Sequence, residues 1–123
     1  MKLGKFQDNV AHSAGRYGLR IFDRYIPRTY PCKPVKSGCN KEPYKANPSV
    51  EAVFENTLTY KNLHNGFIGE HLGAITFKNM TSISNNKING EISSSDESPD
   101  MTARIIDSKI VGHVEEIFEK TWK

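Results

Sequence analysis

Apolar residues near the start of the chain recur at helical intervals. Between residues 4 and 26 they are separated by steps of three, four or more residues that keep to one helix face, at Phe6, Val10, Tyr17, Ile21 and Tyr25. This spacing predicts an amphipathic helix that ends at Pro27. Gly15 and Gly18 weaken it, since each glycine in a helix interior costs about 1 kcal/mol relative to alanine. Two shorter helices are therefore an alternative.

A second helix is predicted from residue 48 to about residue 72. The triplet Asn47-Pro48-Ser49 is typical of a helix start, because asparagine can cap the free amides and proline suits the first turn. Val50, Phe54 and Leu58 then mark one apolar face. The Asn65-Gly66 pair favours a bend, so we expect the helix to be either straight or bent there.

The pattern changes between residues 74 and 93. Ile75 and Phe77 alternate with polar residues, and the isoleucines that follow are separated by Asn, Ser and Gly, which favour turns. We expect a two- or three-stranded antiparallel meander. Asn85-Asn86 and Asn89-Gly90 compete for its hairpin turn, and Asn-Gly is the stronger signal.

The last segment has the most regular helical pattern. Its apolar residues recur every four positions, at Ile106, Ile110, Val114, Phe118 and Trp122. Thr102 or Ser108 could cap this C-terminal helix. If Ser108 is the cap, Ala103–Asp107 can instead form a short strand with Ala103 and Ile105 pointing inward.

These elements predict an α+β fold with N-terminal helices, a small antiparallel β-sheet and a C-terminal helix. Residues 27–48 hold five of the six prolines and read as an irregular connector. No internal repeat is recognised. A chain of 123 residues with 37% hydrophobic residues suits a single domain spanning residues 1–123.

The N-terminus and the cysteines indicate the subcellular location that we expect for the protein. The first residues, MKLGKFQDNV, lack the apolar stretch of a signal peptide, and no segment approaches the roughly 20 apolar residues of a membrane span. Cys32 and Cys39 fit neither a C-x-x-C redox motif nor a usual zinc half-site. We therefore expect a soluble, cytoplasmic protein with two ordinary thiols and no contact with a membrane.

Charge is unevenly distributed along the chain. Eight basic and two acidic residues lie between Arg16 and Lys45, whereas four acidic and no basic residues lie between Glu91 and Asp100. The net charge of +3 is too small to mark a nucleic-acid binder by itself. We expect two surfaces of opposite sign.

Catalytic motifs are absent from the sequence. There is no nucleophile elbow, Walker loop or dinucleotide-binding glycine motif, and we predict no catalytic, cofactor-binding or metal-binding residues. Two histidines and a lysine would suffice for RNA cleavage, but no spacing brings two histidines together, and ordinary surface histidines are the simpler interpretation. The four are His12, His64, His71 and His113.

A stripe of four arginines is interleaved with three tyrosines; the arginines are Arg16, Arg20, Arg24 and Arg28, and the tyrosines are Tyr17, Tyr25 and Tyr30. Such a stripe could hold phosphates and stack bases, which is the basis of an alternative function as a small RNA-binding or RNA-cleaving domain. It could also be a solvated face whose arginines pair with acids elsewhere, or a set of protein-contact anchors.

Two blocks, GKFQDNVAHSAGRYGLRIFDRYIP (residues 4–27) and FENTLTYKNLHNGFIGEHLG (residues 54–73), resemble stretches of immunity proteins of bacterial contact-dependent growth inhibition systems. The resemblance implies a non-enzymatic cytoplasmic domain that binds and neutralises the C-terminal domain of a cognate toxin, often a nuclease. It carries over no individual residues.

An inhibitor of a basic nuclease is expected to present acids to it, because charge complementarity speeds association. The candidate partner-binding acids are Asp96, Glu97, Asp100, Glu115, Glu116 and Glu119. The net positive charge leaves open that Arg16, Arg20 and Arg24 face an acidic toxin surface instead. We expect no direct contact with nucleic acid and leave the oligomeric state open.

Overall fold

The computed structural model describes residues 3–30 and 47–112, and within these two ranges there are strands, turns and extended segments but no helix. In chain order the strands are β1 (Phe6–Gln7), β2 (Val10–His12), β3 (Leu19–Ile21), β4 (Ala52–Glu55), β5 (Leu58–Tyr60), β6 (Asn65–Leu72), β7 (Ile75–Lys78), β8 (Thr81–Ile83), β9 (Ile88–Ser94), β10 (Arg104–Ile106) and β11 (Lys109–Val111).

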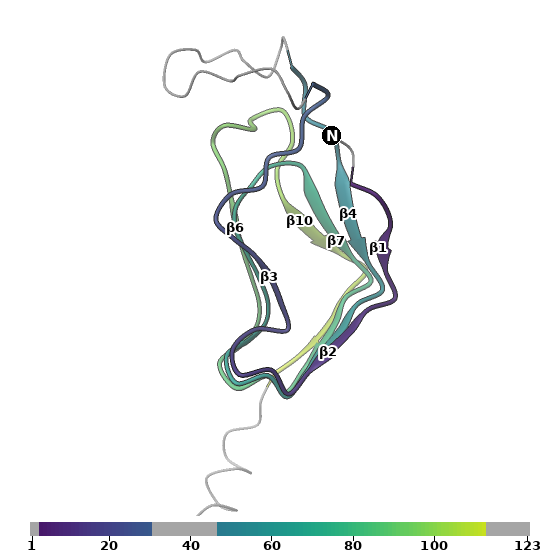
Figure 1. Ribbon diagram of the computed structural model, residues 1–123, viewed down its shortest axis with the longest axis vertical. Coiled ribbons are helices and arrows are strands. Elements are labelled where there is room, and N and C mark those ends of the chain that lie inside the picture. Colours follow the sequence, from purple (N-terminus) through teal and green to yellow (C-terminus); the bar gives the residue numbers. More distant parts are fainter. Residues whose placement is uncertain (1–2, 31–46, 113–123) are drawn as a thin grey trace, which may run out of the picture.

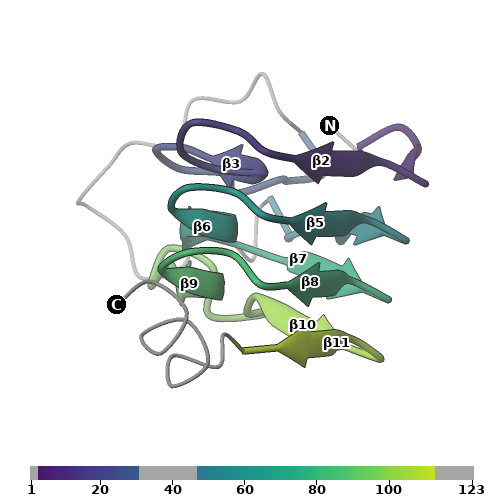
Figure 2. The ribbon, with the colours of Figure 1, turned by 90° about the horizontal axis from the view of Figure 1, so that it is seen from below.

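The strands form three parallel sheets. Sheet A has the order β1-β4-β7-β10, sheet B has the order β2-β5-β8-β11, and sheet C has the order β3-β6-β9. The chain visits A, then B, then C, and then begins the next coil. Figure 1 shows the three sheets around one interior, and Figure 2 shows the coils stacked above one another. This architecture is a parallel β-helix.

The sequence offset between paired residues differs from one pair of neighbouring coils to the next. Phe54 pairs with Phe77, and Asn65 pairs with Ile88, each 23 positions later. The first coil pairs with the second at an offset of 48, as in Phe6 with Phe54, because residues 22–51 separate β3 from β4 in the sequence. The last offset is 28, as in Thr81 with Lys109. The longer offsets arise at one corner of the triangle, the one between sheets C and A.

The corner between sheets A and B repeats one conformation in every coil. Asp8, Asn56, Asn79 and Asp107 occupy it with φ angles of 59°, 49°, 52° and 47°. Asp and Asn tolerate this left-handed region better than other side chains. Asn56 Nδ2 donates to Asp8 Oδ1 at 3.1 Å, and Asn79 Nδ2 donates to Asn56 Oδ1. We call these four residues the corner ladder.

Stacked aromatic rings fill the interior beside sheet A. The centroids of Phe6 and Phe54 are 4.8 Å apart, and those of Phe54 and Phe77 are 5.5 Å apart. Phe67 reaches Phe77 from sheet C at 5.2 Å. Equivalent positions of successive coils therefore pack on each other, as β-helix coils must to bury a continuous core. The buried cluster is Ala52, Phe54, Phe67, Leu72, Ile75, Phe77 and Met80.

The predicted α+β fold is wrong. Residues 4–26 and 48–72, predicted as helices, hold β1–β3 and β4–β6. Residues 74–93 do form strands, but β7, β8 and β9 belong to three different sheets and pair in parallel with other coils, so there is no antiparallel meander. The four-residue steps arise because two short strands flank a tight corner, which places apolar residues at intervals that resemble a helix turn.

The predicted C-terminal helix is wrong over its first part. Ile106 lies in β10 and Ile110 in β11, and residues 113–123, which include Val114, Phe118 and Trp122, lie outside the described residues. The alternative of a short strand agrees with β10, since Ala103 and Ile105 pack against the core. Most of the proline-rich connector, residues 31–46 with both cysteines, is also outside the described ranges. In the part of the chain that is described, no helix has the length and hydropathy of a membrane span.

Candidate binding surface

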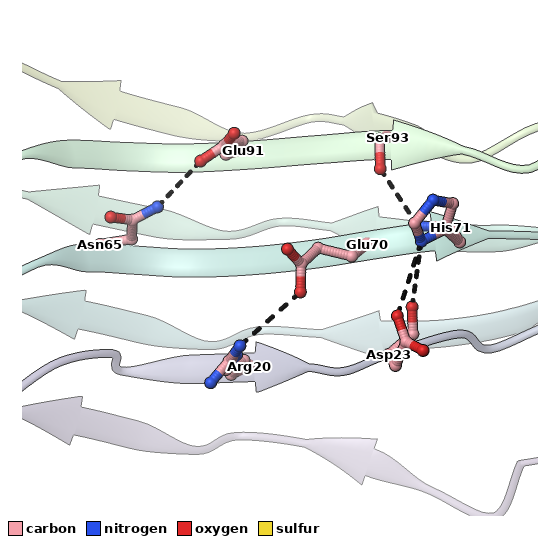
Figure 3. A network of polar contacts seen from close by, with 7 residues as sticks. All are labelled: Arg20, Asp23, Asn65, Glu70, His71, Glu91 and Ser93. Carbon is pink, nitrogen blue, oxygen red and sulfur yellow. Dashed lines mark hydrogen bonds and ion pairs between the residues drawn. The ribbon is translucent and has the colours of Figure 1, made fainter.

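The outer face of sheet C gathers charged and aromatic side chains from the first three coils. Side chains alternate along a strand, so Leu19 and Phe67 point into the core while Arg20 and Glu91 point outward. Figure 3 shows the polar side chains of β3, β6 and β9 on this face. Successive coils therefore bring residues that are far apart in the sequence onto one surface.

Arg20 lies with its guanidinium over two aromatic rings. Its guanidinium carbon lies 4.8 Å from the ring centroid of Tyr17 and 4.4 Å from that of Phe22. The Phe22 side chain is 66% exposed, so its ring stands on the surface. A guanidinium stacked on aromatic rings has few conformations to lose when it binds. We call Tyr17, Arg20 and Phe22 the arginine–aromatic cluster.

Glu70 lies beside this cluster on the next coil. Its Oε2 atom is 3.8 Å from Arg20 Nη2, and this shielded oxygen has no hydrogen-bond partner within the described residues. A separation of 3.8 Å is an electrostatic contact rather than a hydrogen bond. With both side chains 37% exposed, the pair adds little to stability. Losing this ion pair when a ligand binds therefore costs little free energy.

A second group surrounds His71 at the far end of β6. His71 Nδ1 lies 3.8 Å from Asp23 Oδ1 and 3.3 Å from the Asp23 carbonyl oxygen, and the backbone N–H of His71 donates to Ser93 Oγ at 3.1 Å. The chain bulges here, with φ of 48° at His71 and a register shift between Gly69 and Leu72. Figure 3 shows the three side chains on neighbouring coils.

Asn65 at the start of β6 and Glu91 in the middle of β9 extend the polar face, and Asn65 Nδ2 donates to Glu91 Oε2 at 3.1 Å. This face thus carries three carboxylates, from Asp23, Glu70 and Glu91, and one guanidinium, from Arg20. The outer face of sheet C is therefore a mixed-charge surface with an aromatic edge.

The basic and acidic segments meet instead of forming separate surfaces. Arg24 Nη1 pairs with Glu97 Oε1 at 2.9 Å. The buried Arg28 donates through Nη1 to the Asn47 carbonyl oxygen at 3.0 Å and through Nη2 to the Glu97 carbonyl oxygen. The interpretation of an arginine stripe paired with distant acids thus describes Arg20 and Arg24, although on a β-helix rather than on a helix.

Asp100 joins the same corner. It accepts hydrogen bonds from the Ser49 backbone N–H at 3.0 Å and from Ser49 Oγ at 2.8 Å. Burial raises the pKa of Asp100, but these two bonds and the nearby Arg28 charge together outweigh burial and lower the pKa below its usual value. At neutral pH the carboxylate ties the acidic loop to the start of the second coil.

The other predicted partner-binding residues are placed as follows. Arg16 and Asp96 are exposed, in the turn before β3 and in the acidic loop. Glu115, Glu116 and Glu119 lie outside the described residues.

The histidines have different neighbours. His12 stacks on Tyr60 with the ring centroids 4.8 Å apart, and His64 meets the edge of Tyr17 at 5.9 Å, whereas His71 faces Asp23. His113 lies outside the described ranges. No group of three or more His, Cys, Asp or Glu residues that could hold a metal occurs among the residues that the structure describes.

Sequence reasoning missed Phe22, Glu70 and Ser93 as members of one surface. The signal that could have found them is the coil offset: Phe22 lies 48 positions before Glu70, and Ser93 lies 23 positions after it. Aligning the chain on its Phe-x-Asx triplets, which begin at Phe6, Phe54 and Phe77, would have placed these residues side by side.

Comparison with known proteins gives one informative match. No model of a known protein family and no solved structure matches the chain. The chain is similar to a segment of mouse Fibrocystin-L. The two are 32% identical over 124 residues, an alignment that covers 94% of this chain and 3% of the relative. This similarity does not point to a growth-inhibition immunity protein, and that interpretation stays a prediction.

Proposed function

We propose that this chain is a binding module that recognises a protein partner through the outer face of sheet C. The observation that carries the proposal is the arginine–aromatic cluster, in which an exposed Phe22 ring and Tyr17 hold the Arg20 guanidinium on a flat surface. The immunity-protein prediction belongs to the same class of function, and its toxin is one candidate partner.

The residue types of the cluster favour protein recognition. Arg and aromatic side chains are enriched among the residues that dominate binding energy, whereas isolated exposed apolar residues are common and neutral. The stacking supports this function further, since Arg20 is already ordered and loses little side-chain entropy on binding. The parallel sheet beneath it is a rigid support.

The charges around the cluster define the partner's chemistry. Arg20 suits a carboxylate, and the exposed Phe22 ring suits an apolar side chain. The carboxylates around them come from Glu70, Glu91 and Asp23. A matching partner surface therefore has an apolar and acidic centre with basic residues around it. Such complementarity gives specificity and rate more than affinity.

RNA binding, the alternative from sequence, receives less support. Two of the four arginines in the stripe face carboxylates, Arg20 at Glu70 and Arg24 at Glu97, and Arg28 is buried. The carboxylates of sheet C would also repel phosphates. An RNA-binding surface should instead concentrate unpaired cations.

The test compares variants that differ only in the exposed face. Purified wild-type chain, Phe22→Ala, Arg20→Ala and the control Val10→Ala are coupled to beads and used to capture proteins from the source organism. Val10 is 60% exposed but lies on sheet B. Captured proteins are then purified and titrated by calorimetry. A hot-spot residue costs 2 kcal/mol or more, which weakens binding by about thirtyfold.

The proposal requires a partner whose affinity falls with Phe22→Ala and Arg20→Ala but not with Val10→Ala. If every captured protein binds the variants and the wild type equally, the outer face of sheet C is not the binding surface. RNA affinity at low salt that Arg20→Ala abolishes would favour the alternative. Co-expression with the product of the neighbouring gene tests the toxin version, which predicts a stable complex and relief of toxicity.

A further inference from the structure

We propose that Asn79 is an acceptor site for an N-linked oligosaccharide. The triplet Asn79-Met80-Thr81 is the one place in the sequence where asparagine precedes a non-proline residue and then serine or threonine. That pattern is the acceptor motif of N-glycosylation and calls for a surface position. The inference is independent of binding through sheet C, and it requires passage through the secretory pathway, in contrast to the cytoplasmic location expected from the sequence.

The fold presents this triplet outward. Asn79 is exposed at the corner between β7 and β8, in the corner ladder, with φ of 52°. Met80 points into the core and is fully buried, whereas Thr81 is half-buried at the start of β8. Because Met80 is directed inward, the two residues that flank it face the outside together.

The hydrogen bonding of Asn79 leaves room for the modification. Its Nδ2 donates to Asn56 Oδ1 in the corner ladder. A side-chain amide carries two hydrogens, so one can be replaced by the sugar while the other keeps the bond to Asn56. The glycan and the ladder are therefore compatible.

The position also keeps a glycan away from the outer face of sheet C. Figure 1 shows the corner between sheets A and B on the side of the β-helix opposite β3 and β6. A sugar on Asn79 would project into solvent there. It would leave the arginine–aromatic cluster open.

The reaction uses an oligosaccharide linked through a diphosphate to a polyprenyl lipid. The Asn79 amide nitrogen forms a bond to the anomeric carbon of the first sugar, and the bond from that carbon to the diphosphate oxygen breaks. The lipid diphosphate leaves, and the amide proton is lost to a base. No oxidant or reductant is needed.

The chain contains its own matched controls. Asn56 occupies the same corner one coil earlier, with φ of 49° and an exposed side chain, but Leu58 stands where the motif needs a hydroxyl. Asn47-Pro48-Ser49 has proline in the middle, and Asn47 is buried. Position and exposure alone would predict modification of Asn56, whereas the motif predicts Asn79.

The experiment expresses the full chain behind a secretory leader in mammalian cells. Protein from medium and cell extract is analysed by intact mass before and after peptide N-glycosidase, which converts a modified asparagine to aspartate and so marks the site. Scoring both fractions means that a variant that fails to leave the cell is still measured. We expect a single glycan on the wild type, at Asn79.

Asn79→Gln and Thr81→Val should abolish that glycan, and Thr81→Ser should retain it. Leu58→Thr should add a second glycan at Asn56. An unmodified wild-type chain overturns the proposal, as does a glycan that survives in both Asn79→Gln and Thr81→Val. Neither result would bear on binding through sheet C.

Discussion

The Asn62 side-chain amide donates to the side-chain oxygen of Asn85 across 2.8 Å, although the two residues are 23 positions apart in the sequence. Both are fully buried at the turn between sheets B and C. The same Asn85 oxygen accepts the Asn62 backbone N–H at 3.1 Å, and Asn62 Oδ1 accepts the Ala14 backbone N–H at 3.0 Å. These asparagines satisfy buried backbone groups that no sheet ladder reaches.

Replacing Asn85 should therefore destabilise the fold strongly. Asn85→Ala removes the acceptor for two buried Asn62 donors. The backbone N–H loses its side-chain acceptor, and the side-chain amide keeps only the 3.4 Å bond from Nδ2 to the Ala11 carbonyl oxygen. Each such group costs about 1–3 kcal/mol, so we expect a loss of about 2–4 kcal/mol in the free energy of unfolding. Urea denaturation measures it. Asn86→Ala, at an exposed neighbour whose amide bonds to the Leu63 carbonyl oxygen, is the control and should change stability by less than about 1 kcal/mol. Equal losses in the two variants would contradict the role of the buried asparagines.

Close approach of neighbouring coils predicts a second large effect, at Gly66. A Cβ atom there would lie 2.1 Å from Ser82 Oγ and 2.5 Å from the Asn89 carbonyl oxygen. Ser82 is buried and the carbonyl belongs to the backbone, so neither can move freely. Gly66→Ala should cost at least about 3 kcal/mol, the upper range for overpacking a core.

Gly15→Ala is the control for Gly66→Ala, since nothing lies within 4 Å of a Cβ atom at Gly15. We expect its free energy of unfolding to match that of the wild type within about 0.5 kcal/mol. Circular dichroism during thermal unfolding measures both variants. A Gly66→Ala protein as stable as Gly15→Ala would mean that the coils are farther apart at this position of β6.

The fold was partly readable from sequence and partly not. The strand character of residues 74–93 and a short strand near Ile105 follow from the alternation of apolar and polar residues, which neighbouring positions alone determine. The pairing partners do not, because parallel strands join residues 23, 28 or 48 positions apart. The offset of 48 between the first two coils also concealed the repeated Phe-x-Asx triplets.

The helical predictions failed for a physical reason that is visible at Asp107. Ile106 in β10 and Ile110 in β11 are four residues apart, yet the left-handed corner at Asp107 separates them onto two sheets. Apolar spacing reports a helix only if the backbone stays regular between the apolar residues. An Asp or Asn that recurs in each coil, two positions after an apolar residue, indicates a corner, where the backbone is not regular.

The candidate surface was predicted only through Arg20. Its partners Phe22 and Glu70 join it by stacking of coils, so the register had to be known first. The pairing of Arg24 with an acid could be predicted from sequence, since arginine stripes often pair with distant acids. That the acid is Glu97 could not be predicted.

Arg24 and Arg28 should differ sharply in their contributions to stability. Arg28 is buried and donates to two backbone carbonyls, those of Asn47 and Glu97. Charged hydrogen bonds of this kind are worth about 1.5–3 kcal/mol each, so Arg28→Ala should lose about 3 kcal/mol. Arg24 and Glu97 form an exposed ion pair, and Arg24→Ala should lose less than about 1 kcal/mol.

Guanidinium chloride is a salt and would screen the ion pair between Arg24 and Glu97. These two arginine variants are therefore unfolded with urea, at two salt concentrations. The small Arg24 effect should shrink further at high salt, whereas the Arg28 effect should persist because its bonds are buried. If Arg24→Ala proves as costly as Arg28→Ala, the corner depends on the surface ion pair rather than on the buried guanidinium.

The acidic loop predicts a pH dependence centred on Asp100. Hydrogen bonds from Ser49 hold the pKa of this carboxyl below its ordinary value of about 3.9, against the opposing effect of burial. A depressed pKa in the folded state means that the folded protein binds this proton less readily than the unfolded chain. The stabilisation is therefore fully present above the unfolded pKa and is lost as pH falls through the folded one. Asp100→Asn should remove that part of the acid dependence, and urea unfolding between pH 2 and about pH 6 measures it.

Ser49→Ala separates the hydrogen bonds of Asp100 from its charge. It deletes the Oγ donor at 2.8 Å but keeps the backbone donor at 3.0 Å. The pKa of Asp100, followed by the carboxyl carbon shift in NMR, should rise toward its ordinary value without reaching that of a free carboxylate. The acid dependence of stability should weaken in proportion, because the two quantities are linked. An unchanged pKa in Ser49→Ala would mean that the nearby Arg28 charge and the backbone bond alone hold Asp100 ionised, and the serine hydroxyl would then be only a structural contact between the loop and the second coil.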